Sequence, residues 1–345
     1  MNLLVFLSNR CNMTCDYCFL DLNGHASAVL DEKAALRALD AHVAKFAGAR
    51  RVHVTLIGGE PFIHWDLLMS LARRLHAHAG RGVSASVVTN GTLATPERMR
   101  ALAALGVGVT VSLDGDAAAN DAHRALIGGG GPALGRILEK LGGELSGADA
   151  NFTVCEDTAP ALVRGFEALR KAGFRKLKLH LKIQERWTPG GLAALGVALD
   201  GLGRWWRAAG KGLELGNLGS LRPAGPNPHC DSPDPAYQDL VLGADGRFYP
   251  CYSVFAEPFS ALGEWAVGDL DGGVDWKRRE RLHEEARAFI HARLSRARHY
   301  RCPREAYFLA RAAGEDPAGL VRSFHEADNL LGDALSRLLA PAGAP

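Results

Sequence analysis

Residues 10–19 read RCNMTCDYCF and place Cys11, Cys15 and Cys18 on one short segment with C-x3-C-x2-C spacing. Three thiolates at this spacing can hold three corners of a 4Fe–4S cube and leave the fourth iron without a protein ligand. Structural and electron-carrying clusters normally take four thiolates. An open iron therefore predicts that a further molecule binds there, as at catalytic zinc sites. A zinc knuckle or three unrelated thiols is the alternative that the spacing alone leaves open.

Short β-rich apolar runs alternate with longer helical patterns through the first half of the chain. The expected strands are 2–8, 52–57, 83–89, 107–113, 150–155 and 176–183. The expected helices are about 31–47, 65–79, 96–105, 132–143 and 160–172. This order predicts an α/β fold of parallel strands joined by right-handed crossovers, a partial (β/α)6 barrel of the TIM type. Chemistry in such a fold lies at the carboxyl ends of the strands.

Glycines, carboxylates and polar side chains follow three successive expected strands. They are Gly58, Gly59, Glu60 and Pro61 after the second, Asn90 after the third, and Ser112, Asp114, Asn120 and Arg124 after the fourth. Glycines let a ligand approach the backbone, and a carboxylate beside them can accept hydrogen bonds from an ammonium group. GGE alone is also a common turn, and Asp114 with Arg124 is also consistent with a salt bridge within a loop.

Together these motifs, with Tyr17 before the third cysteine, resemble the radical S-adenosylmethionine (radical SAM) superfamily over about residues 1–185. The run SLDG…ND-x-x-R is similar to that of peptide- and protein-modifying members such as anaerobic sulfatase maturases, with Asn120 in place of the usual His. The resemblance implies that the GGEP segment binds the amino group of S-adenosylmethionine. It places Ser112 near this cofactor and Arg124 near its carboxylate. Tyr17, Asn90 and Asp114 complete the expected cofactor-binding set.

The resemblance also implies the chemistry. One electron from the cluster would cleave a C–S bond of S-adenosylmethionine and give a 5′-deoxyadenosyl radical that abstracts a substrate hydrogen. Cys155 ends the fifth expected strand. If solvent-accessible there, its thiol would return a hydrogen atom to a substrate radical; the alternative is a small buried hydrophobe. Gln184 and Glu185, after the sixth strand, are candidate substrate contacts.

A second group of cysteines follows the Pro/Gly-rich stretch 216–235. The segment that ends at Cys251 matches the G-x4-C element of the auxiliary-cluster modules called SPASM and twitch, and Cys230 and Cys302 flank it. We expect these cysteines to hold an auxiliary 4Fe–4S cluster, completed by His299 or by a substrate group. The alternatives are cysteines that only pack or that bind zinc. The cysteine count excludes a full SPASM module with two auxiliary clusters.

The resulting division of the chain has three parts. A radical SAM partial barrel is expected at 1–215, an auxiliary-cluster module with a β-hairpin and helices at 216–310, and a C-terminal helical tail at 311–345. A basic helix at about 276–298 is either a solvated face or a surface for an acidic leader peptide or redox partner.

Composition excludes several classes of protein. The 345 residues are 47% hydrophobic and carry a net charge of +2, which gives no support for a nucleic-acid binder. No run approaches the roughly 18 apolar residues of a membrane span, and there is no signal peptide. We therefore expect a cytoplasmic protein without a membrane partner, whose seven cysteines bind metal rather than form disulfides.

The function expected first is a radical SAM enzyme that crosslinks, epimerises or otherwise modifies a C–H bond of a peptide. Its partners would be the peptide, an electron donor such as flavodoxin or ferredoxin, and a separate leader-recognition protein, because the chain begins almost directly at the first strand. A small-molecule dehydrogenase of the twitch type is the second hypothesis. A non-catalytic iron–sulfur electron carrier is the third, although a GGEP site has no purpose in a carrier.

Overall fold

The computed structural model describes residues 2–20, 28–46, 51–129, 131–209, 212–216, 240–256, 262–294 and 303–339. Cys230, His299 and Cys302, three of the four expected auxiliary-cluster ligands, lie outside the described residues.

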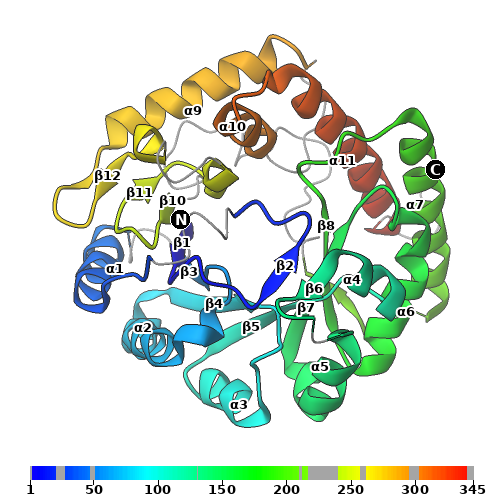
Figure 1. The fold of residues 1–345 in the computed structure, drawn as a ribbon, viewed down its shortest axis with the longest axis horizontal. Helices are drawn as coiled ribbons and strands as arrows, with labels where there is room; N and C mark the ends of the chain where they lie inside the picture. Colours follow the sequence, from blue (N-terminus) through cyan, green and yellow to red (C-terminus); the bar gives the residue numbers. More distant parts are fainter. Residues whose placement is uncertain are drawn as a thin grey trace.

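Six parallel strands form the wall of a partial barrel and neighbour one another in sequence order (Figure 1). They are β1 (Asn2–Phe6), β3 (Val52–Ile57), β4 (Val83–Thr89), β5 (Val107–Ser112), β7 (Ala148–Val154) and β8 (Lys176–Leu181). Each is close to an expected strand, because short β-branched and apolar runs between turn residues favour buried strands. The expected α/β fold, a partial (β/α)6 barrel, is confirmed.

Helices surround this wall on its outer side (Figure 1). They are α1 (Glu32–Phe46), α2 (Trp65–Ala77), α3 (Pro96–Ala104), α4 (Ala117–His123), α5 (Leu134–Leu141), α6 (Leu162–Ala172) and α7 (Pro189–Ala209). Short 3-10 helices join them: η1 (Pro61–His64), η2 (Ala79–Arg81), η3 (Gly142–Gly147) and η4 (Ala159–Ala161). The start of α3 is typical, since Thr95 Oγ1 accepts from the Arg98 backbone N–H (3.3 Å) ahead of Pro96.

The C-terminal part continues the same sheet. β10 (Leu240–Leu242) pairs parallel with β1 and forms the expected hairpin with β11 (Phe248–Tyr249), while β9 (Glu214–Leu215) lies beyond β8. Next come η7 (Tyr252–Ala256), η8 (Leu262–Trp265), β12 (Gly268–Asp269), β13 (Gly273–Val274), α9 (Trp276–His291), α10 (Arg304–Ala312) and α11 (Pro317–Leu339). α11 packs on α7 and α10, so the orange and red helices of Figure 1 complete the ring. The three-part division of the chain remains a prediction.

Two apolar clusters hold the fold together. One lies between the strands and the surrounding helices, with residues such as Val54 and Leu179 fully buried. The other joins Phe6 of β1 to Phe308 of α10 and Phe324 of α11. Each such side chain contributes about 1.5–3 kcal/mol on burial, so the second cluster fastens the C-terminal helices to the barrel. Among the described residues, no helix is both long and apolar enough to cross a bilayer.

Candidate functional site

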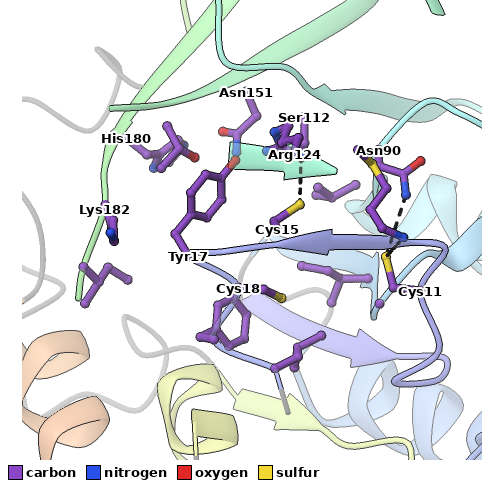
Figure 2. Close-up of a pocket in the computed structure, with 18 of the residues that line it drawn as sticks. Cys11, Cys15, Tyr17, Cys18, Asn90, Ser112, Arg124, Asn151, His180 and Lys182 are labelled. Carbon is purple, nitrogen blue, oxygen red and sulfur yellow. Dashed lines mark hydrogen bonds between the residues drawn. The ribbon is translucent and has the colours of Figure 1, made fainter. Parts of the chain in front are cut away.

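The cysteine loop is held across the barrel by a two-stranded ribbon. β2 (Met13–Cys15) pairs antiparallel with β6 (Arg124–Leu126), so Cys15 lies opposite Arg124. The Asp16 backbone N–H also donates to the His123 carbonyl (3.1 Å). This pairing turns the three cysteines toward one cavity of about 290 Å³ (Figure 2).

The three thiols fit an iron–sulfur cluster in number and surroundings. Cys11, Cys15 and Cys18 are half-buried, line the same cavity and form no disulfide with any described residue. Burial raises the pKa of Cys15 to about 11, against the opposing effect of Arg124, and it also raises the pKa values of the other two. A bound metal cluster reverses this preference, because a coordinating thiol is deprotonated. The three thiols are therefore suited to binding a metal cluster rather than to acting as exposed, reactive thiolates.

The two glycines of the GGEP segment allow the backbone after β3 to contact the backbone of residues 8–10. The Gly59 N–H donates to the Ser8 carbonyl (2.9 Å), and the Glu60 N–H donates to the Arg10 carbonyl (2.7 Å). A Cβ on Gly59 would lie 2.2 Å from the Arg10 oxygen, and one on Gly58 would lie 2.3 Å from the Ser8 oxygen. Only glycine fits this approach, which anchors the chain just before the cysteine loop. Both glycines also line the cavity.

Glu60 fixes the positions of residues near the cavity through hydrogen bonds to its carboxylate. Its buried carboxylate accepts from the backbone N–H groups of Phe62 (2.9 Å) and Asn90 (2.7 Å) and from Thr89 Oγ1 (2.7 Å). Burial raises the pKa of Glu60, and these three hydrogen bonds oppose that rise. Pro61 follows it as the first residue of η1. Neither residue lines the cavity in the described part of the chain, so their contact with S-adenosylmethionine remains a prediction.

Asn90 reaches the cavity edge beside Cys11. Its amide nitrogen donates to Asn12 Oδ1 (2.8 Å) and lies 3.8 Å from Cys11 Sγ, while its oxygen accepts from the Thr92 hydroxyl (2.6 Å). Sequence reasoning missed Asn12, although its position between the first two cysteines was a usable signal. The amide pair links the end of β4 to the cysteine loop.

Asp114 and Arg124 form the ion pair that one interpretation of the sequence predicted. Asp114 is fully buried; its Oδ2 accepts from Arg124 Nε (2.8 Å) and from the Tyr17 hydroxyl, and its Oδ1 accepts from the Thr153 N–H (2.9 Å). Burial raises the pKa of Tyr17, which keeps the phenol protonated as a donor. Asn120, in the position of the family's histidine, accepts from the Asp114 N–H (3.1 Å).

This ion pair also belongs to the cavity. Arg124, Tyr17 and Ser112 line the cavity (Figure 2). Asp114 is not among the lining residues, and its carboxylate holds the guanidinium in place. Arg124 Nη1 is 4.0 Å from Cys15 Sγ, so one positive charge lies beside this sulfur. The two interpretations of the Asp114–Arg124 pair are therefore compatible.

The opposite wall contains side chains at alternate positions of β7, at the end of β8 and in the residues just after β8. Asn151 and Thr153 project from β7, and His180, Lys182 and Gln184 project from β8 and the residues after it. Sequence reasoning named only Gln184 of these five. The signal was present, since polar residues alternate with apolar ones along both expected strands.

Gln184 and Glu185, the candidate substrate contacts after the sixth expected strand, differ in whether they line the cavity. Gln184 lines the cavity and donates from Nε2 to the Tyr17 carbonyl (2.9 Å). Glu185 is not among the described lining residues; its Oε2 lies 3.4 Å from Lys182 Nζ and accepts from the Glu156 N–H (3.2 Å). Glu185 therefore positions Lys182 at the cavity edge.

Cys155 lies just beyond β7, 1% exposed, and is absent from the cavity lining defined by the described residues. Its N–H donates to Thr158 Oγ1 (3.0 Å), and burial raises its pKa to about 12. The thiol is therefore protonated at neutral pH. Its role as a hydrogen-atom donor remains a prediction, to be weighed against this burial.

Cys251 is the one expected auxiliary ligand that the described residues include. It follows the β10–β11 hairpin, is 8% exposed, and packs in the second apolar cluster. Its neighbour Tyr252 lines the main cavity, so this segment reaches the barrel mouth. An auxiliary cluster at Cys251 remains a prediction.

Comparisons with known proteins agree with this architecture. The profile of the Radical SAM superfamily matches residues 5–183, more than half of the chain. PqqA peptide cyclase of Gluconobacter oxydans (strain 621H) is 27% identical over 301 residues, 80% of each chain. The solved structure of histidine-tagged anSMEcpe with bound AdoMet has a TM-score of 0.69 at 18% identity and covers 98% of both chains. That of Streptococcus suis SuiB bound to S-adenosylmethionine has a TM-score of 0.55 at 15% identity, over 73% of this chain and 60% of SuiB.

The profile match covers the cysteine loop, the glycine-containing strand end and both walls of the cavity. The two structural similarities extend the shared fold beyond the barrel. This chain belongs to the radical SAM superfamily.

Proposed function

We propose that this protein is a radical SAM enzyme that modifies a peptide. The observation that carries the proposal is the composition of one cavity, in which three thiols and a glycine-lined strand end face a wall of polar side chains. Relatives of similar fold or sequence support the substrate class. One is named PqqA peptide cyclase, and others were solved with the Cp18Cys peptide or the precursor peptide SuiA.

Cys11, Cys15 and Cys18 would hold the 4Fe–4S cluster through three irons, which leaves the fourth for S-adenosylmethionine. When bound, these groups supply a radical that abstracts a hydrogen atom from the substrate. Gly58 and Gly59 line the cavity at the strand end, where their backbone would contact the amino group of the cofactor.

Arg124 supplies the positive charge for the cofactor's carboxylate. Asp114 already fixes its Nε, so the guanidinium keeps its orientation when a ligand arrives, and little rotamer entropy is lost. Arg124 lines the cavity, and its guanidinium has further N–H groups besides those at Nε and beside Cys15 Sγ that could donate to a carboxylate. Apolar lining residues such as Phe19, Leu20 and Ile183 reduce the access of water to the reacting atoms.

The polar wall would bind the peptide. Asn151, Thr153, His180 and Lys182 offer donors and acceptors that match backbone amides and polar side chains. We propose crosslinking or epimerisation as the reaction, with an external one-electron donor such as flavodoxin or ferredoxin and a separate leader-recognition protein as partners.

Anaerobic reconstitution followed by iron analysis and measurement of 5′-deoxyadenosine tests the cluster assignment. Cys15→Ser should lose the cluster and its S-adenosylmethionine cleavage, because the thiolate is the only strong donor at that position. Thr14→Ala is the matched control, since Thr14 is exposed on the same ribbon and should behave as wild type. Wild-type cleavage by Cys15→Ser would overturn the assignment.

Incubation with a candidate precursor peptide, such as any short peptide found to be encoded beside this gene, tests the substrate class. Crosslinking removes two hydrogens from the peptide mass, whereas epimerisation leaves the mass unchanged in H2O and adds one deuterium in D2O. Cleavage of S-adenosylmethionine that is stimulated only by a small alcohol would instead support the twitch-type dehydrogenase and exclude peptide modification.

The auxiliary cluster is a separate proposal on Cys230, Cys251 and Cys302, with His299 as its fourth ligand. Its test is the triple variant Cys11→Ala/Cys15→Ala/Cys18→Ala after anaerobic reconstitution. Retention of about four irons with a reducible EPR signal supports the second cluster, and His299→Ala then tests the fourth ligand. Loss of all iron from a folded triple variant overturns it.

A further inference from the structure

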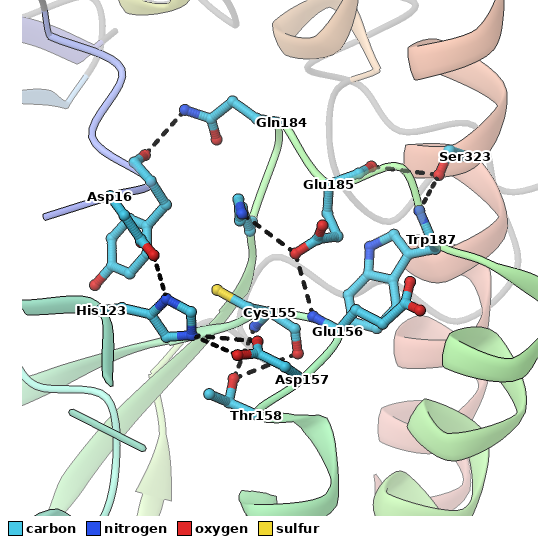
Figure 3. A network of polar contacts seen from close by, with 12 residues as sticks. Asp16, His123, Cys155, Glu156, Asp157, Thr158, Gln184, Glu185, Trp187 and Ser323 are labelled. Carbon is cyan, nitrogen blue, oxygen red and sulfur yellow. Dashed lines mark hydrogen bonds and ion pairs between the residues drawn. The ribbon is translucent and has the colours of Figure 1, made fainter. Parts of the chain in front are cut away.

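A histidine, a cysteine and an aspartate meet outside the cavity, at the carboxyl end of β7. One ligand atom from each of His123, Cys155 and Asp157 lies within 4.8 Å of the others. His123 ends α4, and the other two belong to the loop after β7 (Figure 3). We propose that these three side chains bind one divalent metal ion of the zinc class.

The histidine is already oriented as a metal ligand. Its Nδ1 lies 2.7 Å from Asp16 Oδ2, which leaves Nε2 directed at Asp157, 3.1 Å from Oδ2 (Figure 3). Histidines that ligate metals almost always engage a carboxylate or carbonyl through the other ring nitrogen, and this contact fixes the ring and its tautomer. Asp16 supplies that second contact here, from the cysteine loop.

The cysteine is buried beside this imidazole without a polar role of its own. Its backbone N–H donates to Thr158 Oγ1 (3.0 Å), and its carbonyl accepts from the Ala159 N–H (2.9 Å). Its Sγ has no hydrogen-bond partner among the residues that the structure describes, although the side chain is 1% exposed. A thiol placed this way within reach of an imidazole and a carboxylate completes a donor set.

The chemical types of the three ligand atoms indicate which metal ion would bind. One sulfur, one imidazole nitrogen and one carboxylate oxygen suit zinc, whereas calcium and magnesium require oxygen ligands. Ligand atoms around tetrahedral zinc lie roughly 3.3–3.8 Å apart, for bonds of about 2.0–2.3 Å. Because the three ligand atoms lie within 4.8 Å of one another, metal binding would draw them together by up to about 1 Å, and the Asp157 side chain, which is 65% exposed, has room to adjust.

The local charge favours a cation. The carboxylates of Asp16, Asp157 and Glu185 surround the site, against the single ammonium of Lys182. Three protein ligands leave a fourth position, which would bind water or a substrate oxygen. The site shares no ligand with the cysteine triad, so it does not depend on the proposed cluster; with zinc bound, Cys155 would be a thiolate ligand and not the hydrogen-atom donor.

Zinc binding to the reconstituted protein tests the proposal. The cluster is installed first, so that Cys11, Cys15 and Cys18 are occupied; loosely bound metal is removed with a chelator, and zinc chloride is then titrated. The wild type should bind one more equivalent of zinc than Cys155→Ala. Asp157→Asn, which alters an exposed side chain, should weaken binding at least about tenfold without unfolding the protein. Asp66→Asn, an exposed carboxylate on α2, is the control.

Cobalt(II) gives an independent readout. A thiolate-to-cobalt charge-transfer band should appear in the wild type and be absent from Cys155→Ala. Asp16→Asn keeps all three ligands and should weaken binding about 10–100-fold through the loss of histidine orientation. Equal zinc stoichiometry and equal cobalt spectra in wild type and Cys155→Ala would overturn the proposal, and would leave His123 as an ion-paired bridge between two loops.

Discussion

The two walls of the main cavity are built from different kinds of group. On the side of β1, β3 and β4, the lining consists of sulfur atoms, glycine backbone and an amide locked to its neighbours. On the side of β7 and β8, its polar part consists of side chains at alternate positions, with the apolar Leu181 and Ile183 among them. The first wall is determined by the path of the backbone, and the second by the choice of side chains.

This difference predicts which of the two walls tolerates amino-acid substitution and which does not. A substitution in the first wall displaces the cysteine loop, because backbone atoms already touch there. A substitution in the second wall changes a contact and leaves the strand in place. We therefore expect the first wall to be needed for cluster assembly and the second to determine the substrate.

Gly59→Ala should have the largest effect. The added Cβ would lie 2.2 Å from the Arg10 carbonyl oxygen, which is backbone and cannot rotate away, so the cysteine loop must shift. We expect the variant to lose the cluster iron from the triad after anaerobic reconstitution. Gly135→Ala on α5 has open space around its Cβ and should retain wild-type iron. Normal iron in Gly59→Ala would contradict the distinction between the walls.

Asp114→Asn tests the support that the first wall receives from the buried ion pair. The change leaves Arg124 buried without its carboxylate and should cost about 3–5 kcal/mol of unfolding free energy, measured by chemical denaturation. Asp116→Asn is the comparison, because Asp116 caps α4 and pairs with the exposed Arg164 (3.2 Å), and its change should cost about 1 kcal/mol or less. The double variant Asp114→Asn/Arg124→Met should recover part of the loss. Equal stability of the two single variants would show that the pair is unimportant.

His42 lies on α1, outside both walls, and gives a reference for the stability of the fold. Burial holds its pKa at about 4, below the ordinary value. Because the unfolded chain binds this proton and the folded chain does not, the contribution is fully present above pH 6.5 and is lost as the pH falls toward 4. The loss should be about 3 kcal/mol. His42→Phe should flatten this part of the pH–stability profile; an unchanged profile would exclude His42 as its cause.

Lys182→Met should have the smallest and most selective effect. It removes the ammonium from the second wall and its contact with Glu185 (3.4 Å) but retains the length of the side chain. We expect about a tenfold loss in turnover of the precursor peptide, or about 1.4 kcal/mol, with wild-type cluster iron. A parallel loss of iron would show that the second wall also supports the cluster.

Most of the barrel could be predicted from the sequence because its strands are locally marked. The expected strand 52–57 coincides with β3 (Val52–Ile57), and the helix at 96–105 ends one residue later than α3 (Pro96–Ala104). α7 (Pro189–Ala209) was missed because its glycines lower helix propensity, and burial against α6 and α11 outweighs them. The three-residue β10 (Leu240–Leu242) is stabilised by its pairing with β1 on one side and β11 on the other.

The candidate site residues also divide into those that the sequence predicted and those that it did not. Cys11, Cys15 and Cys18 are recognisable because their spacing on one loop carries the signal by itself. Asn12 was missed because it acquires its role from Asn90, a partner distant in the sequence. Lys182 was missed because the cavity that it lines is formed by segments distant in the sequence. The burial of Cys155, and its meeting with His123, likewise depend on how α4 returns over the end of β7.

The sequence by itself determined the superfamily, the barrel and the cysteine triad, because these depend on periodicity and spacing within short segments. The tertiary structure alone decided which side of the Asp114–Arg124 pair faces the cavity, which polar side chains form the second wall, and that Glu60 supports Asn90 from behind. Those features arise from packing between segments far apart in the chain. Local propensity carries no information about such contacts, since the same side chain is buried or exposed according to its neighbours.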